Sequence, residues 1–187
     1  MKKLFLILGL LTVLSLYDSA AQKWAVKTNL LYDATASLNL GVETALTQKW
    51  TLDVSGNWNP FQISENRKWK HWMVQPEARY WFCDSFQGHF LGVHALVGAY
   101  NITNANIFKS ELSDNRYQGY AAGAGVAYGY AFALSHHFNL EFEVGAGYVY
   151  TQYDRFECDG CGKMLESKVP KHYVGPTKAA IGIVYIF

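Results

Sequence analysis

Residues 138–150 read FNLEFEVGAGYVY. Large apolar side chains occupy most of the even-numbered positions of this run, and the positions between them carry asparagine, glutamate, glycine and one valine. Because successive side chains of a β-strand point to opposite faces, a period of two predicts a strand with one apolar face and one polar or small face. The run therefore predicts β structure, and the rest of the chain repeats it.

The same alternation recurs on both sides of this run. In residues 120–132, tyrosine, valine, phenylalanine and alanine alternate with glycine and alanine, and in residues 50–58 apolar residues alternate with Thr51, Asp53 and Ser55. A helical period does not appear over a useful length. The pattern predicts eight strands, which are Trp24–Ala34, Leu38–Leu46, Trp50–Asn59, Trp69–Phe82, Gly88–Ile102, Tyr117–Leu134, Phe138–Tyr153 and His172–Phe187.

Alternation alone does not say which face points inward, because a soluble β-sandwich would bury its apolar face. The lengths of the connections favour an outer-membrane barrel, in which short periplasmic turns alternate with longer external loops. The short connections are Thr47–Lys49, Cys83–Gln87 and Ser135–His137, and the long ones are Phe61–Lys68, Thr103–Arg116 and Asp154–Lys171. One external connection, Thr35–Ser37, is unusually tight.

Aromatic residues and the end of the chain favour the same class. Tyrosine and tryptophan gather near strand ends, where amphipathic rings suit the headgroup level of a bilayer; these residues are Trp24, Trp50, Trp58, Trp69, Trp72, Tyr80, Trp81, Tyr148 and Tyr150. The chain ends on alternating apolar residues, of which the last are Tyr185 and Phe187. This ending resembles the β-signal by which outer-membrane barrels are recognised for assembly.

The first residues predict a secreted precursor. Lys2 and Lys3 precede an apolar run over 4–16, and small residues follow it at 19–21. This is the order of a signal peptide, with cleavage near Ala21 or Gln22. The run is shorter than the roughly 20 residues of a membrane-spanning helix. We therefore predict a signal peptide over 1–22 and one barrel domain over 23–187.

Length and charge narrow the class further. The chain has 187 residues, which suits one domain. Removing residues 1–22 takes two basic side chains from 16 and one acidic side chain from 15, leaving 14 of each. A near-neutral chain argues against nucleic acid as a partner. No later segment carries 18 consecutive apolar residues, which excludes a helical membrane protein.

Several short motifs resemble a known family. They are KTNLLYDAT at 27–35, WKHW at 69–72 with QPEARYW at 75–81, GHFLG at 88–92 with His94, and GPTKA at 175–179. Together they resemble the DUF3575 family of Bacteroidetes outer-membrane barrels, over essentially the whole mature chain. The resemblance implies a barrel of the OmpA or OmpX type and implies no established activity. The predicted fold is thus an all-β, eight-stranded, antiparallel, up-and-down transmembrane β-barrel.

If the apolar face points to lipid, the interior of the barrel receives ionic side chains, and each needs a partner. The inward positions are Lys27, Asn29, Asp33, Glu43, Asp53, Gln75, Glu77, Arg79, Glu141, Glu143 and Lys178. The lumen charge network that we predict from them comprises Lys27, Glu43, Asp53, Glu77, Arg79, Glu141, Glu143 and Lys178. We expect Lys27 to face Glu43. Asp53 would lie one strand from Arg79, and Lys178 beside the strand of Glu141 and Glu143. A barrel of eight strands is just wide enough for such side chains, so we predict a filled lumen without a permanent pore.

Other groupings of chemically active residues have simpler explanations. Three carboxylates with a nearby histidine have the residue types of acid–base catalysis, but a buried salt-bridge network accounts for the same carboxylates. These residues are Glu77, Glu141 and Glu143, with His71 or His94. The pair His136 and His137 lies in a turn and lacks a third metal ligand. We therefore expect no catalytic, cofactor-binding or metal-binding residues.

Cys158 and Cys161 form a C-x-x-C motif in the longest external loop. A structural zinc site needs four ligands, and the remaining cysteine, Cys83, is expected at the opposite end of the barrel. In an oxidising envelope a disulfide between Cys158 and Cys161 is the favoured state. Metal binding and free thiols remain as alternatives.

These observations predict a non-enzymatic outer-membrane barrel that acts in surface interaction, in envelope structure or in anchoring a surface assembly. The expected partners are outer-membrane lipids, the barrel-assembly machinery and a surface or periplasmic protein, without nucleic acid or a cofactor. One alternative is an outer-membrane lipid-modifying enzyme. Another is a soluble periplasmic barrel that binds a ligand as lipocalins do.

Overall fold

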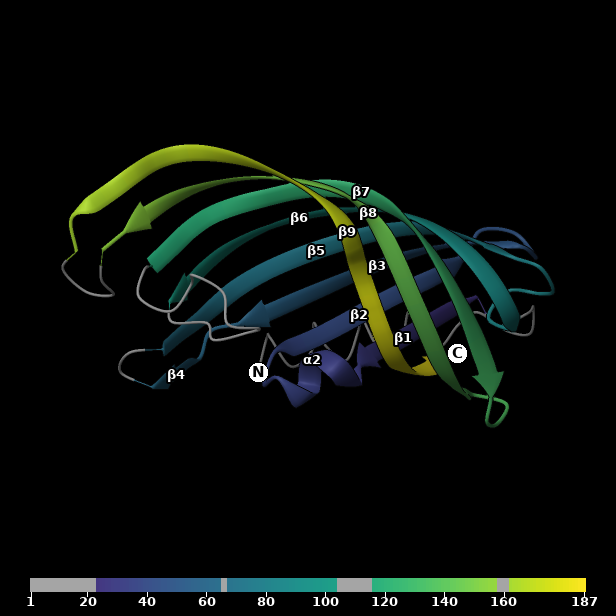
Figure 1. The fold of residues 1–187 in the computed structure, drawn as a ribbon. Helices are drawn as coiled ribbons and strands as arrows, with labels where there is room; N and C mark the ends of the chain where they lie inside the picture. The colour runs from purple at the N-terminus through teal and green to yellow at the C-terminus, as the bar shows by residue number, and fades with distance from the viewer. Residues whose placement is uncertain (1–22, 65–66, 104–115, 158–161) are drawn as a thin grey trace, which may run out of the picture.

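A computed structural model of the chain describes residues 23–64, 67–103, 116–157 and 162–187 (Figure 1). The predicted signal peptide, residues 1–22, lies outside the described residues. No helix in the described ranges is long and apolar enough to cross a membrane. The elements within these ranges are β1 (Trp24–Asn29), α2 (Leu30–Ala34), β2 (Leu38–Ala45), β3 (Trp50–Asn59), β4 (Gln62–Ser64), β5 (Arg67–Trp81), β6 (Gly88–Thr103), β7 (Arg116–Ala133), β8 (Phe138–Phe156) and β9 (Met164–Ile186).

Eight of the described strands form a ring-like sheet. Their order is β3, β2, β1, β9, β8, β7, β6 and β5, and β5 pairs in turn with β3. Every pairing is antiparallel, and the short β4 adds only to the start of β5. The predicted all-β fold with eight antiparallel strands is therefore confirmed.

The ring turns apolar side chains outward and encloses polar ones. Val93, Val126 and Val144 are 65%, 62% and 65% exposed, whereas Glu141 and Glu143 are 3% and 2% exposed. Since neighbouring positions on one strand differ this strongly, the alternation in the sequence reflects the two faces of the sheet. The strand pattern alone did not decide which face of the sheet points inward, and the burial of the side chains shows that it is the polar face.

The wall of the ring is much taller on one side. β1 and β2 have 6 and 8 residues, whereas β8 and β9 have 19 and 23. Figure 1 shows the green and yellow strands β7 to β9 extending beyond the ends of β1 and β2. β9 pairs with β1 only over Gly182–Ile186. Before Gly182, the described residues supply a strand on one side of β9 only, which is β8.

Glycines on the tall wall allow neighbouring backbones to approach closely. A Cβ atom at Gly147 would meet the carbonyl oxygen of Ala124 and would lie 2.6 Å from the Cα atom of Gly125. Only a residue without a side chain fits there, which is a common reason for glycine in a strand interior. The glycines that alternate with larger residues over 119–131 thus let the backbones of β7 and β8 approach each other closely.

Two segments differ from the predicted elements. The sequence predicts one strand over Trp24–Ala34, but β1 ends at Asn29 and α2 follows, because the Asn29 side chain accepts a hydrogen bond from the Leu31 N–H at 3.1 Å and caps the helix. The sequence also predicts a long loop over Asp154–Lys171. Instead β8 continues to Phe156 and β9 begins at Met164, so paired strands take up most of this segment.

Candidate functional site

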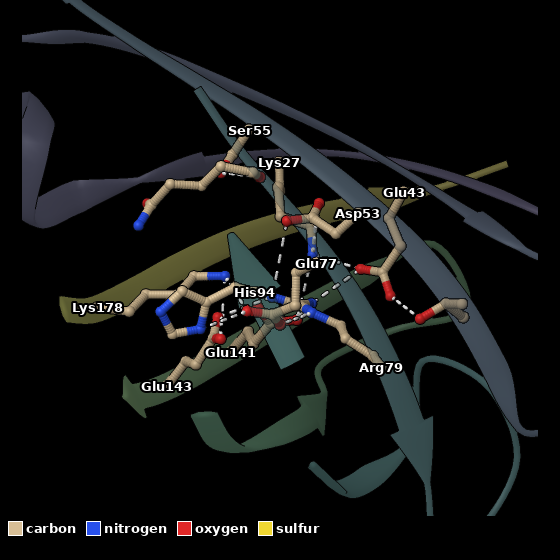
Figure 2. A network of polar contacts seen from close by, with 12 residues as sticks. Lys27, Glu43, Asp53, Ser55, Glu77, Arg79, His94, Glu141, Glu143 and Lys178 are labelled. Carbon is tan, nitrogen blue, oxygen red and sulfur yellow. Dashed lines mark hydrogen bonds and ion pairs between the residues drawn. The ribbon is translucent and has the colours of Figure 1, made fainter. Parts of the chain in front are cut away.

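Ionic side chains from six strands meet inside the ring, near the end with the short turns (Figure 2). All of them have side chains that are 9% exposed or less. The structure brings together every residue of the predicted charge network: Lys27, Glu43, Asp53, Glu77, Arg79, Glu141, Glu143 and Lys178. This enclosed network is the candidate site.

Arg79 of β5 lies at the centre of the network. Its Nε atom donates to Glu77 at 2.6 Å, and its Nη1 atom donates to Glu43 at 2.9 Å and to Glu141 at 3.0 Å. The Nη2 atom donates to Glu143 at 2.7 Å. The fork of guanidinium donors suits several carboxylates at once, which explains arginine rather than lysine at this position.

Lys27 of β1 neutralises the carboxylates on the side of the shorter strands. Its ammonium group bonds to Glu43 and lies 3.4 Å from Asp53 and 3.6 Å from Glu141. Glu43 also accepts a hydrogen bond from the Thr51 hydroxyl. Lys27 and Glu43 lie on the paired strands β1 and β2, where the sequence predicted them to face each other.

Lys178 of β9 serves the other side of the network. Its Nζ atom donates to Glu77 at 2.7 Å and lies 3.0 Å from a Glu143 oxygen. His94 lies beside them, with its Nε2 atom 2.9 Å from the Thr177 hydroxyl and its Nδ1 atom 3.7 Å from Glu77. Sequence reasoning considered His94 as an acid–base candidate and as part of a family motif, and did not place it beside the charge network. Its parity, shared with the inward Gly92, could have placed it inside.

Glycines on neighbouring strands provide the space that the long ionic side chains occupy. A Cβ atom at Gly92 would lie 2.6 Å from a Glu77 carboxylate oxygen, and one at Gly41 would lie 2.6 Å from the Cγ atom of Lys27. Gly41 is directly opposite Lys27, and Gly92 lies on β6, which pairs with the strand of Glu77. The packing therefore depends on small residues at these two positions.

The network holds five carboxylates against three cations, and its atoms nearly fill the interior. Asp53 Oδ1, His94 Nδ1 and Glu143 Oε1 are buried without a hydrogen bond. The cavity among these residues measures about 30 Å³, the space of a water molecule. No group of three histidine, cysteine or acidic side chains suited to a metal ion occurs in the described part of the chain. The arrangement can hold strands together, but it has no room for an organic substrate.

An apolar cluster closes the ring below the network, at the end with the short turns. Trp81, Phe86 and Phe90 are packed there at 0–4% exposure, and the guanidinium carbon of Arg79 lies 4.5 Å from the centroid of the Phe90 ring. The sequence-based placement of Trp81 in an outer aromatic girdle is wrong. Its indole N–H donates to the Thr51 hydroxyl inside the ring at 2.9 Å, because Trp81 shares the parity of Arg79. The Trp69 side chain lies outside the described part.

The helix α2 contacts β9 as well as β1 and β2, and its Tyr32 lines the small cavity of the network. Asp33 was predicted to face inward, but it lies exposed on α2 and accepts a hydrogen bond from the Thr28 hydroxyl at 2.8 Å. Burial raises the pKa of the Tyr32 phenol above its ordinary value. Asn29 ties the helix to β9, since its side chain donates to the Ala179 carbonyl at 3.0 Å. The predicted inward residue Gln75 is buried.

The remaining predicted positions fall at the two ends of the ring. Tyr185 and Phe187 lie at the end of β9, where the Phe187 N–H donates to the Trp24 carbonyl at 2.8 Å. Cys83 is an exposed free cysteine in the turn between β5 and β6. The predicted disulfide partners Cys158 and Cys161 lie outside the described residues.

A family model described as "Protein of unknown function (DUF3575)" matches residues 4–187. No curated protein matches the chain, and no solved structure matches it. The match covers all of the network described above, and its description assigns no activity to it.

Proposed function

The chain belongs to the DUF3575 family, and from this premise we propose that it is an eight-stranded transmembrane β-barrel in the outer membrane of a Bacteroidetes cell, of the OmpA or OmpX type. Lipid offers no hydrogen bonds, so a spanning sheet must close on itself. The ring described above meets that requirement. In this proposal residues 1–22 are a signal peptide that is removed on export.

One observation carries the proposal: a belt of exposed apolar side chains surrounds a ring whose charges are enclosed. Water-soluble proteins have the opposite arrangement, with apolar side chains inside and charged ones outside. In water, an exposed belt of valine and leucine would be costly, and buried charges would gain nothing in return. In lipid it is the expected arrangement. The outward belt comprises Leu38, Leu40, Val42, Leu52, Val54, Val74, Leu91, Val93, Val97, Val126, Phe142, Val144 and Ile183.

Aromatic side chains border the belt at both ends. At the end with the short turns, Trp50 packs on Tyr80 with ring centroids 5.2 Å apart, and Tyr130 packs on Phe132 at 4.3 Å. At the other end Tyr120 is exposed on the same strand as Tyr130. The interval of ten residues spans about 34 Å along the strand, or roughly 26 Å along the axis at a tilt of about 40°. An apolar band of about 25 Å is usual for such barrels.

We further propose that the barrel is not an enzyme and acts through its ends. The interior is occupied by its own side chains, so contacts with other molecules fall to the connections beyond the strands. The tall strands β7 to β9 would raise one side of the barrel above the lipid surface. Such a structure suits contact with a surface molecule, support of the envelope or anchoring of a surface assembly, with outer-membrane lipids and the barrel-assembly machinery as its general partners.

Two alternatives fit the geometry less well. A soluble barrel that holds an apolar ligand needs an apolar interior, and here the interior is ionic with a cavity of about 30 Å³. A lipid-modifying enzyme needs its reacting groups within reach of a substrate, and the carboxylates of the network are each 4% exposed or less. Both alternatives remain outcomes of the following experiment.

The test is to express the full chain with its own leader in a Gram-negative host. We expect the mature protein in the outer-membrane fraction, starting near Gln22 or Lys23, and migrating differently in gels with and without boiling. The leader-less chain is the control and should stay in the cytoplasm. Recovery of the exported protein in the detergent-free periplasmic extract would favour the soluble binder, and a changed lipid A in a deletion strain would favour the enzyme.

The proposed role at the surface has a separate test. Replacing the connections over 61–66, 104–115 and 157–163 with short glycine–serine linkers should leave membrane insertion unchanged, because the belt and the network are untouched. We expect loss of surface attachment, fibre display or envelope integrity. Retention of all three properties would contradict a role at the surface.

A further inference from the structure

A hollow of about 670 Å³ lies over the strands at the end of the ring opposite the short turns. Its floor is a row of residues that face one another across strands: Trp58 opposite Trp72, Trp72 opposite Ala99, and Ala99 opposite Tyr120. Directly opposite residues share a face of the sheet. Because the three aromatic residues of this row are exposed, the row lies on the outer face, and the small Ala99 leaves space between two rings.

A second row borders the same hollow two residues closer to the strand ends. Lys70 is opposite Asn101, Asn101 is opposite Gln118, and Gln118 is opposite Asp154. A step of two residues keeps the face, so these polar residues lie on the outer side above the aromatic row. Lys168 lines the hollow from β9. The order along the outer wall is therefore apolar belt, aromatic row and polar row.

Some polar groups of the hollow are already bonded, and others are uncommitted. Asp154 accepts hydrogen bonds from the Lys168 backbone N–H at 2.7 Å and from the Ser167 hydroxyl at 3.1 Å. In contrast, no hydrogen bond or ion pair of the Lys70 or Lys168 ammonium group is found among the described residues. The Asn101 side-chain oxygen is shielded from solvent without a hydrogen-bond partner. Among the described residues, the two ammonium groups of the hollow thus lack an ion partner, and the Asn101 amide oxygen lacks a hydrogen-bond donor.

We propose that this hollow binds the phosphorylated sugar headgroup of a glycolipid. The ammonium groups would bind phosphate, the amides of Asn101 and Gln118 would bind hydroxyl groups, and the aromatic row would pack on the sugar and on the start of the acyl chains. The acyl chains would continue over Val74 and Val97, which lie on the outer face below. This inference rests on the proposed position in the outer membrane.

The size of the site favours a headgroup with two phosphates. β5 and β9 are four strand intervals apart, or roughly 19 Å between backbones. If the Lys70 and Lys168 side chains extend from the two borders toward the centre of the hollow, the gap between their ammonium groups is wider than one phosphate. The volume also exceeds that of a single phosphate ion. A bisphosphorylated disaccharide fits both observations.

The test uses the full-length mature chain folded in neutral detergent and lipid A with two phosphates as the probe, with binding measured by titration. We expect the double variant Lys70→Gln/Lys168→Gln to bind at least tenfold more weakly. The matched control is Lys23→Gln/Lys49→Gln, which removes two exposed lysines at the other end and should change affinity less than twofold. An equal loss in both double variants would overturn the proposal.

Three ligand arms use the unmodified chain, so they do not depend on the folding of a variant. Dephosphorylated lipid A should bind at least tenfold more weakly, and phosphatidylglycerol should also bind more weakly. The free bisphosphorylated disaccharide should compete, though with lower affinity. Equal affinity for the dephosphorylated probe or for phosphatidylglycerol would overturn the proposal. Fractionation of the cells reports the membrane position independently, so failure of the headgroup site and failure of the barrel proposal give different results.

Discussion

At the scale of single residues, the interior depends on one guanidinium group. Arg79 is 1% exposed and contacts four glutamates from three strands. Burying an arginine costs several kcal/mol in lost hydration, and only its bonds to the carboxylates offset this cost. Removing only the cation or only the carboxylates therefore lowers the stability strongly, because the remaining charges are buried without partners. The complete network, by comparison, adds little stability relative to an apolar core.

We predict that Arg79→Met lowers the free energy of unfolding by about 3–5 kcal/mol, because it leaves five carboxylates with two lysines. The measurement is urea unfolding of the detergent-folded chain, followed by tryptophan fluorescence. Lys49→Met at an exposed turn is the control and should stay within about 0.5 kcal/mol. A similar stability of both variants would show that the network does not hold the fold.

A matched pair of glycines tests the packing around the network. Gly92→Ala should destabilise the fold by about 1–3 kcal/mol, because the new methyl group displaces the Glu77 carboxylate. Gly56→Ala should be nearly neutral, since the nearest atom to its Cβ, the Leu40 carbonyl oxygen, is 4.0 Å away. The midpoint of thermal unfolding distinguishes them. Equal shifts would contradict the close packing seen at Gly92.

The sequence predicts which residues of the network face inward, but not which atoms meet. Parity places the eight ionic residues on one common face, because a strand has only two faces, and burial identifies that face as the inner one. The bonds from Arg79 to Glu141 and Glu143 cross the ring from β5 to β8, which are not neighbours in the sheet. Such contacts depend on the diameter of the ring and on the glycines that admit long side chains, and neither follows from parity.

At the scale of elements, the predictions fail where a strand no longer has one apolar face. Over Asp154–Lys171 the strands rise beyond the apolar belt, and most of the described residues are exposed or half-exposed, so alternation is not required there. The prediction of a strand over residues 30–34 is wrong for another reason. The Asn29 cap and the short connection to β2 favour a helical turn over further strand, which is a local effect that a period of two does not report.

Asn29→Ala tests the junction of β1, α2 and β9. We expect a loss of about 1–2 kcal/mol in the free energy of unfolding, because the Asn29 side chain caps α2 and also bonds to β9 at Ala179 and Ile181. Asn29→Asp keeps the oxygen that caps the helix but loses the donor to Ala179, so its loss should be smaller. Denaturant unfolding measures both, and an aspartate variant less stable than the alanine variant would contradict this role.

At the scale of the whole molecule, three layers succeed one another along the axis. An apolar cluster closes the end with the short turns, the ionic network lies directly next to it, and the tall wall extends beyond the network. Because the network joins six strands, we expect the ring to unfold as one unit. The chemical character of the outer surface then determines whether the ring is stable in lipid or in water.

Val126→Arg tests those surroundings. Val126 is exposed near the middle of the belt, opposite Val93 on the neighbouring strand. In a lipid bilayer we expect a loss of about 2–4 kcal/mol, because the charge would lie near the midplane. Leu134→Arg, at an exposed turn, should cost about 1 kcal/mol or less. The measurement is unfolding in phospholipid vesicles, and equal costs would argue against a lipid-facing belt.

The one-sided pairing of β9 has a consequence for how copies of the chain behave together. Before residue 177, the border of β9 away from β8 pairs with no strand of the described residues, and such a border is a template on which another molecule can extend the sheet, which is a route to aggregation. Here that border carries Pro170 and Pro176, which lack a backbone N–H, together with Lys168 and Lys171, whose charges repel a like copy. The composition of β9 thus opposes self-templating, and crowded copies would remain separate molecules.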